Sequence, residues 1–183
     1  MTRIVAGTYG GRRLQTPPGD STRPTSDRVR EAMFSSIASE LGGLDGLRVL
    51  DLFAGSGALG LEAISRGAVA ADLVESDRRT VQVIRRNVAD LGCEGARVHQ
   101  TTVERFVRAR PSAPYDLVML DPPYALPGDE VAALVAAVSA PGWRTDDSLV
   151  VVERATRDGW VWPAGVEALR DRAYGETTLW YGR

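Results

Sequence analysis

The chain has 183 residues, of which 44% are hydrophobic and 25% are charged, and this composition fits one globular domain while excluding disorder and a collagen-like fold. All 22 basic residues are arginine, so a Schiff-base lysine, a P-loop phosphate clamp and a kinase-type ATP contact are excluded. One histidine, His99, and one cysteine, Cys93, cannot build a Cys/His zinc site. We therefore expect a metal-free protein of a reducing compartment, the cytoplasm, and the absence of a signal peptide or a long apolar run predicts no association with a membrane.

Positive charge is concentrated at the amino end of the chain. Residues 1–30 carry a net charge of +4, and the rest of the chain carries −6. The arginine bias of a GC-rich genome would give a similar distribution, but a basic arm ahead of an acidic body is also typical of a segment that contacts phosphates. The candidate RNA-binding residues are Arg3, Arg12, Arg13, Arg23, Arg28 and Arg30.

The first forty residues predict a hairpin followed by a helix. Residues 4–9 and 11–15 are short extended runs on either side of a Gly10-Gly11 turn. Thr25 or Asp27 can cap a helix whose apolar residues recur every four positions, and Gly42 stops it. We expect residues 1–42 to form an RNA-docking extension and residues 43–183 to form the catalytic domain.

The rest of the chain alternates between strand and helix patterns. Strands are predicted at 47–53, 69–75, 96–101, 115–120 and 148–153, and helices at 60–66, between Asp77 and Gly92, at 103–109 and at 129–139. Residues 165–181 predict two more strands that meet near Tyr174-Gly175. This alternation indicates an α/β fold with a doubly wound, Rossmann-like parallel sheet, to which the amino-terminal hairpin and helix are added.

A glycine motif follows the first strand of this sheet. The strand runs into Ala54-Gly55-Ser56-Gly57-Ala58-Leu59-Gly60, a complete G-x-G-x-x-G between a strand and a helix. Glu75 ends the next strand, 20 residues beyond Gly55, and is suited to a pair of ribose hydroxyls. A tight packing turn would explain the glycines alone, but the glycines and the carboxylate together favour a nucleoside-containing cofactor.

Asp51 helps to choose between two cofactors. A dinucleotide would bring a negatively charged pyrophosphate to this turn, where the Asp51 carboxylate would repel it. S-adenosylmethionine instead carries a positive ammonium and a positive sulfonium, which a carboxylate stabilises. The sequence therefore favours S-adenosylmethionine over NAD.

A second motif, Asp121-Pro122-Pro123-Tyr124, comes directly after the predicted strand at 115–120. An exocyclic amine on a base is a poor nucleophile, and two hydrogen-bond acceptors would help to orient its lone pair. Asp121 and the carbonyl of Pro122 can supply them, since the two prolines restrict the backbone. Tyr124 can stack on a base that has been flipped out of its helix. An Asp-Pro-Pro turn with a surface tyrosine is the structural alternative.

Together these motifs resemble the class I S-adenosylmethionine-dependent methyltransferases that modify amino groups of bases. The segments Arg3–Gly7, Gly11–Leu14 and Arg23–Phe34 narrow the resemblance to the RsmD family of 16S ribosomal RNA guanine-N2 methyltransferases. The resemblance implies methylation of one guanine in small-subunit RNA, with assembled subunits preferred over bare RNA. Such enzymes often carry Asp or Asn where this chain has Thr102, whose hydroxyl can still accept a hydrogen bond. The expected cofactor pocket is Asp51, Phe53, Ala54, Gly55, Gly57, Glu75, Ser76 and Thr102, and the expected catalytic residues are Asp121, Pro122, Pro123 and Tyr124.

Three other functions stay open at this point. The same Asp-Pro-Pro-aromatic motif could act on the N6 amine of adenine in DNA or RNA. A nicotinamide oxidoreductase is disfavoured by Asp51, and a non-catalytic RNA-binding assembly factor is disfavoured by the intact motifs. We expect a monomer that uses S-adenosylmethionine and binds 16S rRNA.

Overall fold

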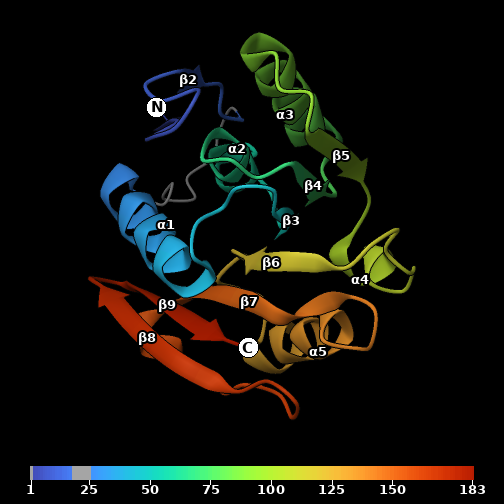
Figure 1. Cartoon of the computed structure of the whole chain (residues 1–183). Helices are drawn as coiled ribbons and strands as arrows, with labels where there is room; N and C mark the ends of the chain where they lie inside the picture. Colours follow the sequence, from blue (N-terminus) through green and yellow to red (C-terminus); the bar gives the residue numbers. More distant parts are fainter. Residues whose placement is uncertain (1, 18–25) are drawn as a thin grey trace.

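The computed structural model describes residues 2–17 and 26–183, and its centre is a seven-stranded sheet with the order β5-β4-β3-β6-β7-β9-β8. The strands from β5 to β7 run parallel, whereas β9 is antiparallel to both β7 and β8 (Figure 1). This arrangement confirms the predicted doubly wound α/β fold. The part of Arg23–Phe34 that precedes Ser26, including Arg23, lies outside the described residues.

The elements of the parallel part follow one another in strict alternation. They are β3 (Arg48–Leu52), α2 (Ala58–Ser65), β4 (Ala70–Glu75), α3 (Arg78–Leu91), β5 (Ala96–Gln100), α4 (Val103–Phe106), β6 (Tyr115–Leu120), α5 (Gly128–Val138) and β7 (Arg144–Ala155). A short 3-10 turn, η1 (Thr156–Asp158), leads on to β8 (Ala168–Tyr174) and β9 (Thr177–Gly182). Before them come β1 (Thr2–Arg3), β2 (Arg13–Leu14) and α1 (Asp27–Leu41).

The sheet separates two hydrophobic cores, because successive side chains of a strand point to opposite faces. In β3, Val49 packs into the core under α1, α2 and α3, and Leu50 packs into the core under α4 and α5. Figure 1 shows these two groups of helices on opposite sides of the sheet. Strands buried on both faces explain the nearly continuous apolar runs of the sequence.

The Asp77 cap and the two glycine ends are as expected, but the expected cap of α1, Thr25 or Asp27, is wrong. The Ser26 hydroxyl accepts a hydrogen bond from Val29 N, so α1 is capped one residue before Asp27. Asp77 caps α3 by accepting from Thr80 N at 2.8 Å. Gly42 and Gly92 end these two helices in the left-handed conformation that favours glycine.

The amino-terminal hairpin differs from the expectation. Its two strands pair over only two residues each, Thr2 with Leu14 and Arg3 with Arg13. Ile4 still bonds across the hairpin, donating to the Arg12 carbonyl and accepting from Gly11 N, both at 2.9 Å. The next two residues bind α2 instead: Val5 N and Ala6 N both donate to the carboxylate of Glu62, at 2.7 and 3.0 Å. The arm, which we define as residues 2–15, is therefore fastened to the body of the protein by its own backbone.

Gly7 makes this close approach possible. Its φ is +81°, and a Cβ built there would lie 1.8 Å from the carbonyl oxygen of Ser65, so no other residue fits. Thr8 N donates to that same carbonyl at 2.7 Å, and Tyr9 N donates to the Ser65 hydroxyl at 2.9 Å. The arm thus covers the carboxyl end of α2.

The strand expected at 148–153 is longer than predicted. β7 spans twelve residues, from Arg144 to Ala155, because Tyr115 of β6 pairs with its first residue and β9 pairs with its second half up to Ala155. The two strands of the tail meet at a turn at Gly175, as expected. Among the described residues no helix is both long and apolar enough to cross a membrane.

Candidate functional site

The candidate site lies where the strand order of the sheet reverses, between β3 and β6. Ligands of open α/β sheets bind beyond the carboxyl ends of the strands at such a point. Asp51 belongs to the end of β3, and Asp121 follows the end of β6. The two strands are paired, with Asp51 opposite Met119, so both predicted motifs meet at one edge of the sheet.

The glycine turn after β3 has a backbone that most residues avoid. Gly55 and Gly57 have φ of 54° and 81°, and Phe53 also lies in the left-handed region, at 66°. A Cβ at Gly57 would come within 3.1 Å of both Ile84 and Leu73. Glycine is therefore needed at position 57 for its conformation as well as for its size.

Asp51 is buried directly beneath this turn, with 1% of its surface exposed. Its Oδ2 accepts a hydrogen bond from Gly60 N at 2.8 Å, while Oδ1 has no hydrogen-bond partner among the described residues. Burial, opposed by the hydrogen bond from Gly60 and aided by the charge of Glu75, raises the pKa of Asp51 to about 7. The site thus holds an acid that a nearby cation would return to its ionised form.

A cavity of about 240 Å³ opens beside the turn, and its walls come from the ends of three strands. The lining residues are Phe53, Val74, Glu75, Ser76, Thr102, Val103 and Glu104. Four of them, Phe53, Glu75, Ser76 and Thr102, belong to the cofactor pocket expected from the sequence.

Two polar residues of this cavity, Glu75 and Thr102, already have partners within the chain. Glu75 accepts from Gly55 N at 3.1 Å and from Asp77 N at 2.8 Å. The Thr102 hydroxyl caps α4 by accepting from Arg105 N at 3.3 Å. Ala54 is buried, and its N–H donates to the Val74 carbonyl. These bonds hold the glycine turn against the end of β4.

The Asp121 loop lies at the same edge of the sheet. Burial and the nearby carboxyl groups of Glu153 and Asp51 raise the pKa of Asp121 well above its usual value. Pro122 is buried, whereas Pro123 is exposed and accepts a hydrogen bond from Leu126 N at 2.8 Å. Tyr124 is 44% exposed, and its hydroxyl lies 3.0 Å from Thr177 Oγ1 of β9. An aromatic ring is thus accessible beside a half-buried acid.

The arginines of the amino end do not form one surface. Arg12, Arg13 and Arg28 are exposed, and Arg12 donates to the Asp90 carbonyl at the end of α3. Arg3 is 61% exposed and pairs with Asp27 at 2.8 Å.

Arg30 is the exception, and the expectation that it contacts RNA is wrong. Its side chain is 1% exposed. The guanidinium pairs with Asp27 at 2.7 Å, donates to the carbonyl of Arg3 and lies 3.6 Å from the buried carboxylate of Glu62. Net charge along the sequence could not reveal this role, because Glu62 is distant in the chain.

Asn87 is a site residue that the sequence analysis missed. It is buried on α3, and its amide donates to the carbonyls of Ser56 and Gln15, at 2.9 and 3.0 Å, while Gln15 N donates back at 2.8 Å. It therefore joins the glycine turn to the arm. The sequence pattern could have identified Asn87, because it is a polar residue three positions after Ile84, within the apolar stripe of the helix.

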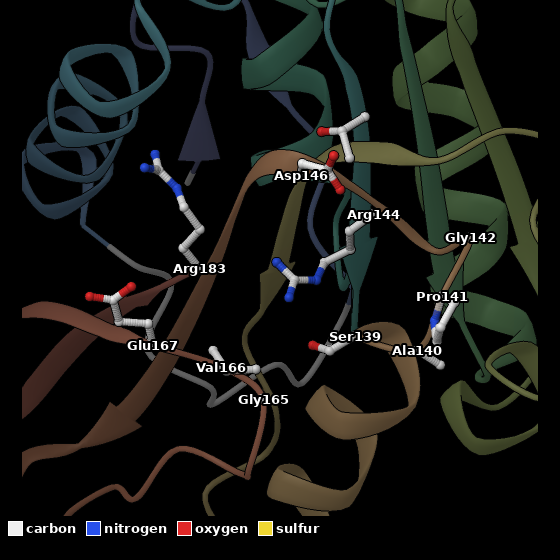
Figure 2. A pocket seen from close by; sticks show the side chains of 11 residues that line it. Ser139, Ala140, Pro141, Gly142, Arg144, Asp146, Gly165, Val166, Glu167 and Arg183 are labelled. Carbon is white, nitrogen blue, oxygen red and sulfur yellow. The ribbon is translucent and has the colours of Figure 1, made fainter.

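A larger cavity than the one beside the glycine turn lies elsewhere, at the opposite edge of the sheet where β7 begins. It measures about 820 Å³, and Figure 2 shows Arg144 between Arg183 and Ser139 at the end of α5. Arg144 bonds the Ser148 hydroxyl at 2.8 Å. None of the predicted site residues lines this cavity. Among the described residues no group of three or more His, Cys, Asp and Glu could hold a metal ion.

Comparison with known proteins places this geometry in a family. The chain is 38% identical over 157 residues to the ribosomal RNA small subunit methyltransferase D of Escherichia coli K12, a match that covers 86% of this chain and 76% of the relative. A solved structure of a candidate methyltransferase of Escherichia coli, yhhF, has 34% identity and a TM-score of 0.84, with 99% of this chain and 96% of that chain covered.

Two further matches agree with these. A hypothetical protein of Thermus thermophilus has 34% identity and a TM-score of 0.82, with 99% of this chain and 98% of that chain covered. The precorrin-6y C5,15-methyltransferase of Geobacter metallireducens, at 14% identity, shares the fold with a TM-score of 0.69 over 100% of this chain and 99% of that chain. The model of the family described as conserved hypothetical protein 95 matches residues 2–183. The chain belongs to this family, the RsmD family of methyltransferases that its motifs resemble.

Proposed function

We propose that the protein transfers a methyl group from S-adenosylmethionine to the exocyclic N2 amine of a guanine in 16S ribosomal RNA, in assembled small subunits. One observation carries the proposal. The glycine-turn cavity and the Asp121 loop lie at the same edge of the sheet, on either side of Asp51. The name of the Escherichia coli relative supports ribosomal RNA of the small subunit as the substrate. The choice of guanine over adenine rests on the family resemblance.

The residues of the turn fit this cofactor. Asp51 has a buried oxygen without a partner, which suits an ammonium or sulfonium group. Glu75 and Ser76 lie in the cavity wall where ribose hydroxyls would bind, and Phe53 and Thr102 form walls suited to the adenine ring. Gly55 and Gly57 let the backbone come close to the methionine part. When bound, S-adenosylmethionine supplies an electrophilic methyl group on a positively charged sulfur.

The Asp121 loop would hold the amine that receives the methyl group. Asp121 and the Pro122 carbonyl accept the two hydrogens of the amine and aim its lone pair. Tyr124, whose side chain is exposed, stacks on the flipped-out base. The methylated nitrogen carries a surplus proton, and the raised pKa of Asp121 makes its carboxylate a suitable acceptor.

The exposed arginines of the arm and of α3 would dock the RNA. Arg12 contacts the end of α3, so the two elements lie next to each other, as Figure 1 also shows. The exposed basic residues on them are Arg3, Arg12, Arg13, Arg78, Arg79, Arg85 and Arg86. Arg28, exposed near the start of α1, completes the proposed set. The protein is further proposed to act as a monomer and without a metal ion.

The deciding experiment identifies the methylated nucleoside. Undermethylated small subunits are incubated with the protein and a methyl-labelled cofactor, and the RNA is digested and separated. We expect N2-methylguanosine as the labelled product. Labelled N6-methyladenosine would establish the adenine alternative, and binding to subunits without any label would establish the assembly factor.

The Asp121→Ala variant tests the assigned mechanism. We expect single-turnover methylation to be lost and cofactor binding to be retained, since Asp121 holds the amine. Near-normal methylation by this variant would contradict the assignment. Tyr124→Ala should lose about 1 to 3 kcal/mol of stacking, while Tyr124→Phe should lose much less because the ring remains.

A further inference from the structure

The cavity of about 820 Å³ at the amino end of β7 holds polar groups that the proposed methyl transfer does not use. Arg144, Arg183 and Ser139 all belong to its wall. In each of them one buried polar atom has no hydrogen-bond partner among the described residues: Nε of the two arginines and the hydroxyl oxygen of Ser139. Since Nε–H can only donate and a hydroxyl can also donate, the cavity presents several donors that lack an acceptor.

Three separate elements hold these donors in place. Ser139 directly follows α5, and Arg144 is the first residue of β7. Arg183 follows β9, where its N–H donates to the Glu167 carbonyl at 2.9 Å and its carbonyl accepts from Glu167 N at 2.7 Å. Figure 2 shows the Arg144 guanidinium between Arg183 and Ser139. The donors thus reach the cavity from different directions.

The guanidinium of Arg144 is fixed at one end and free along one side. Its Nη1 donates to the Ser148 hydroxyl at 2.8 Å, while Nε, which lies on the opposite side together with Nη2, has no partner among the described residues. Burial lowers the pKa of Arg144, so no carboxylate of the described chain compensates fully for the water that this cation has lost. A bound anion would supply the missing partner.

Two acidic residues, Asp146 and Glu167, also line the cavity, and both are exposed. Water and salt screen an exposed carboxylate, so it repels an anion only weakly. Figure 2 shows the Glu167 carboxylate pointing away from Arg144. The buried donors therefore determine what the cavity binds, and they favour an anion over a cation.

We propose that this cavity binds a phosphate group, which the Nε sides of Arg144 and Arg183 and the hydroxyl of Ser139 hold together. A guanidinium can bind two phosphate oxygens through parallel N–H bonds. Phosphate oxygens point in several directions, which suits donors from three elements better than the flat carboxylate group does. An RNA backbone and a free phosphate compound both present these oxygens. The cavity lies at the sheet edge opposite to the proposed methyl-transfer site, so this binding goes beyond the function proposed above.

The test follows the arginine side chains of the full chain while inorganic phosphate is added. Their Nε–H signals are recorded by NMR at constant ionic strength, with chloride as the balancing ion, and are assigned from Arg144→Gln and Arg183→Gln. In the wild type we expect both signals to shift along one saturating curve. Either substitution should weaken the affinity for phosphate about 10- to 100-fold, because a charged hydrogen-bond partner is lost.

A matched variant and the wild type itself keep the test decisive. Arg157→Gln removes an arginine of η1 that is 82% exposed, and it should keep the wild-type affinity. An equal loss in this variant would show binding by general surface charge and would overturn the proposal. A wild-type response without saturation overturns it as well, even if Arg144→Gln does not fold. Equal affinity of the wild type and a folded Arg183→Gln has the same meaning.

Filter binding to small subunits then distinguishes the two sources of phosphate. If RNA supplies the group, Arg183→Gln should flatten the plot of log affinity against log salt by up to about 0.7 to 0.9. An unchanged slope, together with the weakened binding of inorganic phosphate, assigns the cavity to a free phosphate compound. The methylation assay decides the proposed function separately, since none of the residues assigned to methyl transfer lines this cavity.

Discussion

Asp51 is an acid that destabilises the fold when it is ionised. Its folded pKa of about 7 lies above the ordinary value of 3.8, so between these pH values the folded state holds one proton more than the unfolded state. Stability therefore falls as pH rises through this window. We expect Asp51→Asn, which can still accept from Gly60 N, to gain up to about 4 kcal/mol in free energy of unfolding at pH 8 and less at pH 5. Urea unfolding at both pH values checks this, and an equal gain at both would refute it.

The same residue makes cofactor binding depend on pH. Only the ionised carboxylate attracts the positive groups of S-adenosylmethionine, so the affinity of the wild-type protein should rise as pH increases through about 7. Asp51→Asn should bind more weakly by roughly 1.5 to 3 kcal/mol at pH 8 and should show a flatter pH profile. Titration calorimetry from pH 6 to 8.5 measures both effects. A variant with the wild-type affinity at pH 8 would exclude Asp51 from the cofactor site.

At the scale of elements, Asn87 makes α3 a brace between the arm and the glycine turn. Asn87→Ala would leave the Gln15 backbone and the Ser56 carbonyl without this partner, at a cost of about 2 kcal/mol in free energy of unfolding. Gln82→Ala, an exposed position on the same helix, should change stability by less than about 0.5 kcal/mol. Chemical denaturation of the two variants provides the comparison, and equal losses would show that the bridge contributes nothing.

The elements that sequence predicts best are those whose ends carry a local chemical signal. The strand at 115–120 has the predicted bounds, and α3 runs from its Asp77 cap to Gly92. The bounds of β7 and of the hairpin were missed because distant partners set them: β9 extends the former, and Glu62 takes the backbone donors that would have extended the latter. The glycine turn and the Asp121 loop were placed correctly at one sheet edge, because each motif directly follows a strand that could be predicted from the sequence. Glu153 and Asn87 were not identified from the sequence, because the role of each depends on contacts with residues that are distant in the chain.

At the scale of the whole molecule, the positive charge of the amino end divides into a buried structural residue, Arg30 of α1, and the exposed arginines of the arm. Replacing Arg3, Arg12 and Arg13 with Gln should flatten the plot of log affinity for small subunits against log salt by up to about 0.7 to 0.9 per lost phosphate contact. Cofactor affinity should not change. Arg30→Gln removes one positive charge from a buried place, so it should lower stability and leave the salt slope intact.

Filter binding over a series of salt concentrations gives these slopes. An unchanged slope in the triple variant would show that the arm does not contact phosphates, and the arginines of α3 would then be the docking surface. Point substitutions are a cleaner test than deletion of residues 1–15, because Ile4 and Leu14 are buried in the core under α1, α2 and α3. Removing them would cost several kcal/mol of stability, about 2 to 5 for each large apolar side chain.

The docking of the arm also constrains the order of events during synthesis. Val5 donates to Glu62, 57 residues further along the chain, and Gln15 donates to Asn87, 72 residues further along. The residues of the arm are therefore made well before their partners, and contacts of such long range form slowly. A nascent chain that has not yet completed α3 carries a free basic segment, and this segment is locked in place only when the helix that braces it has left the ribosome.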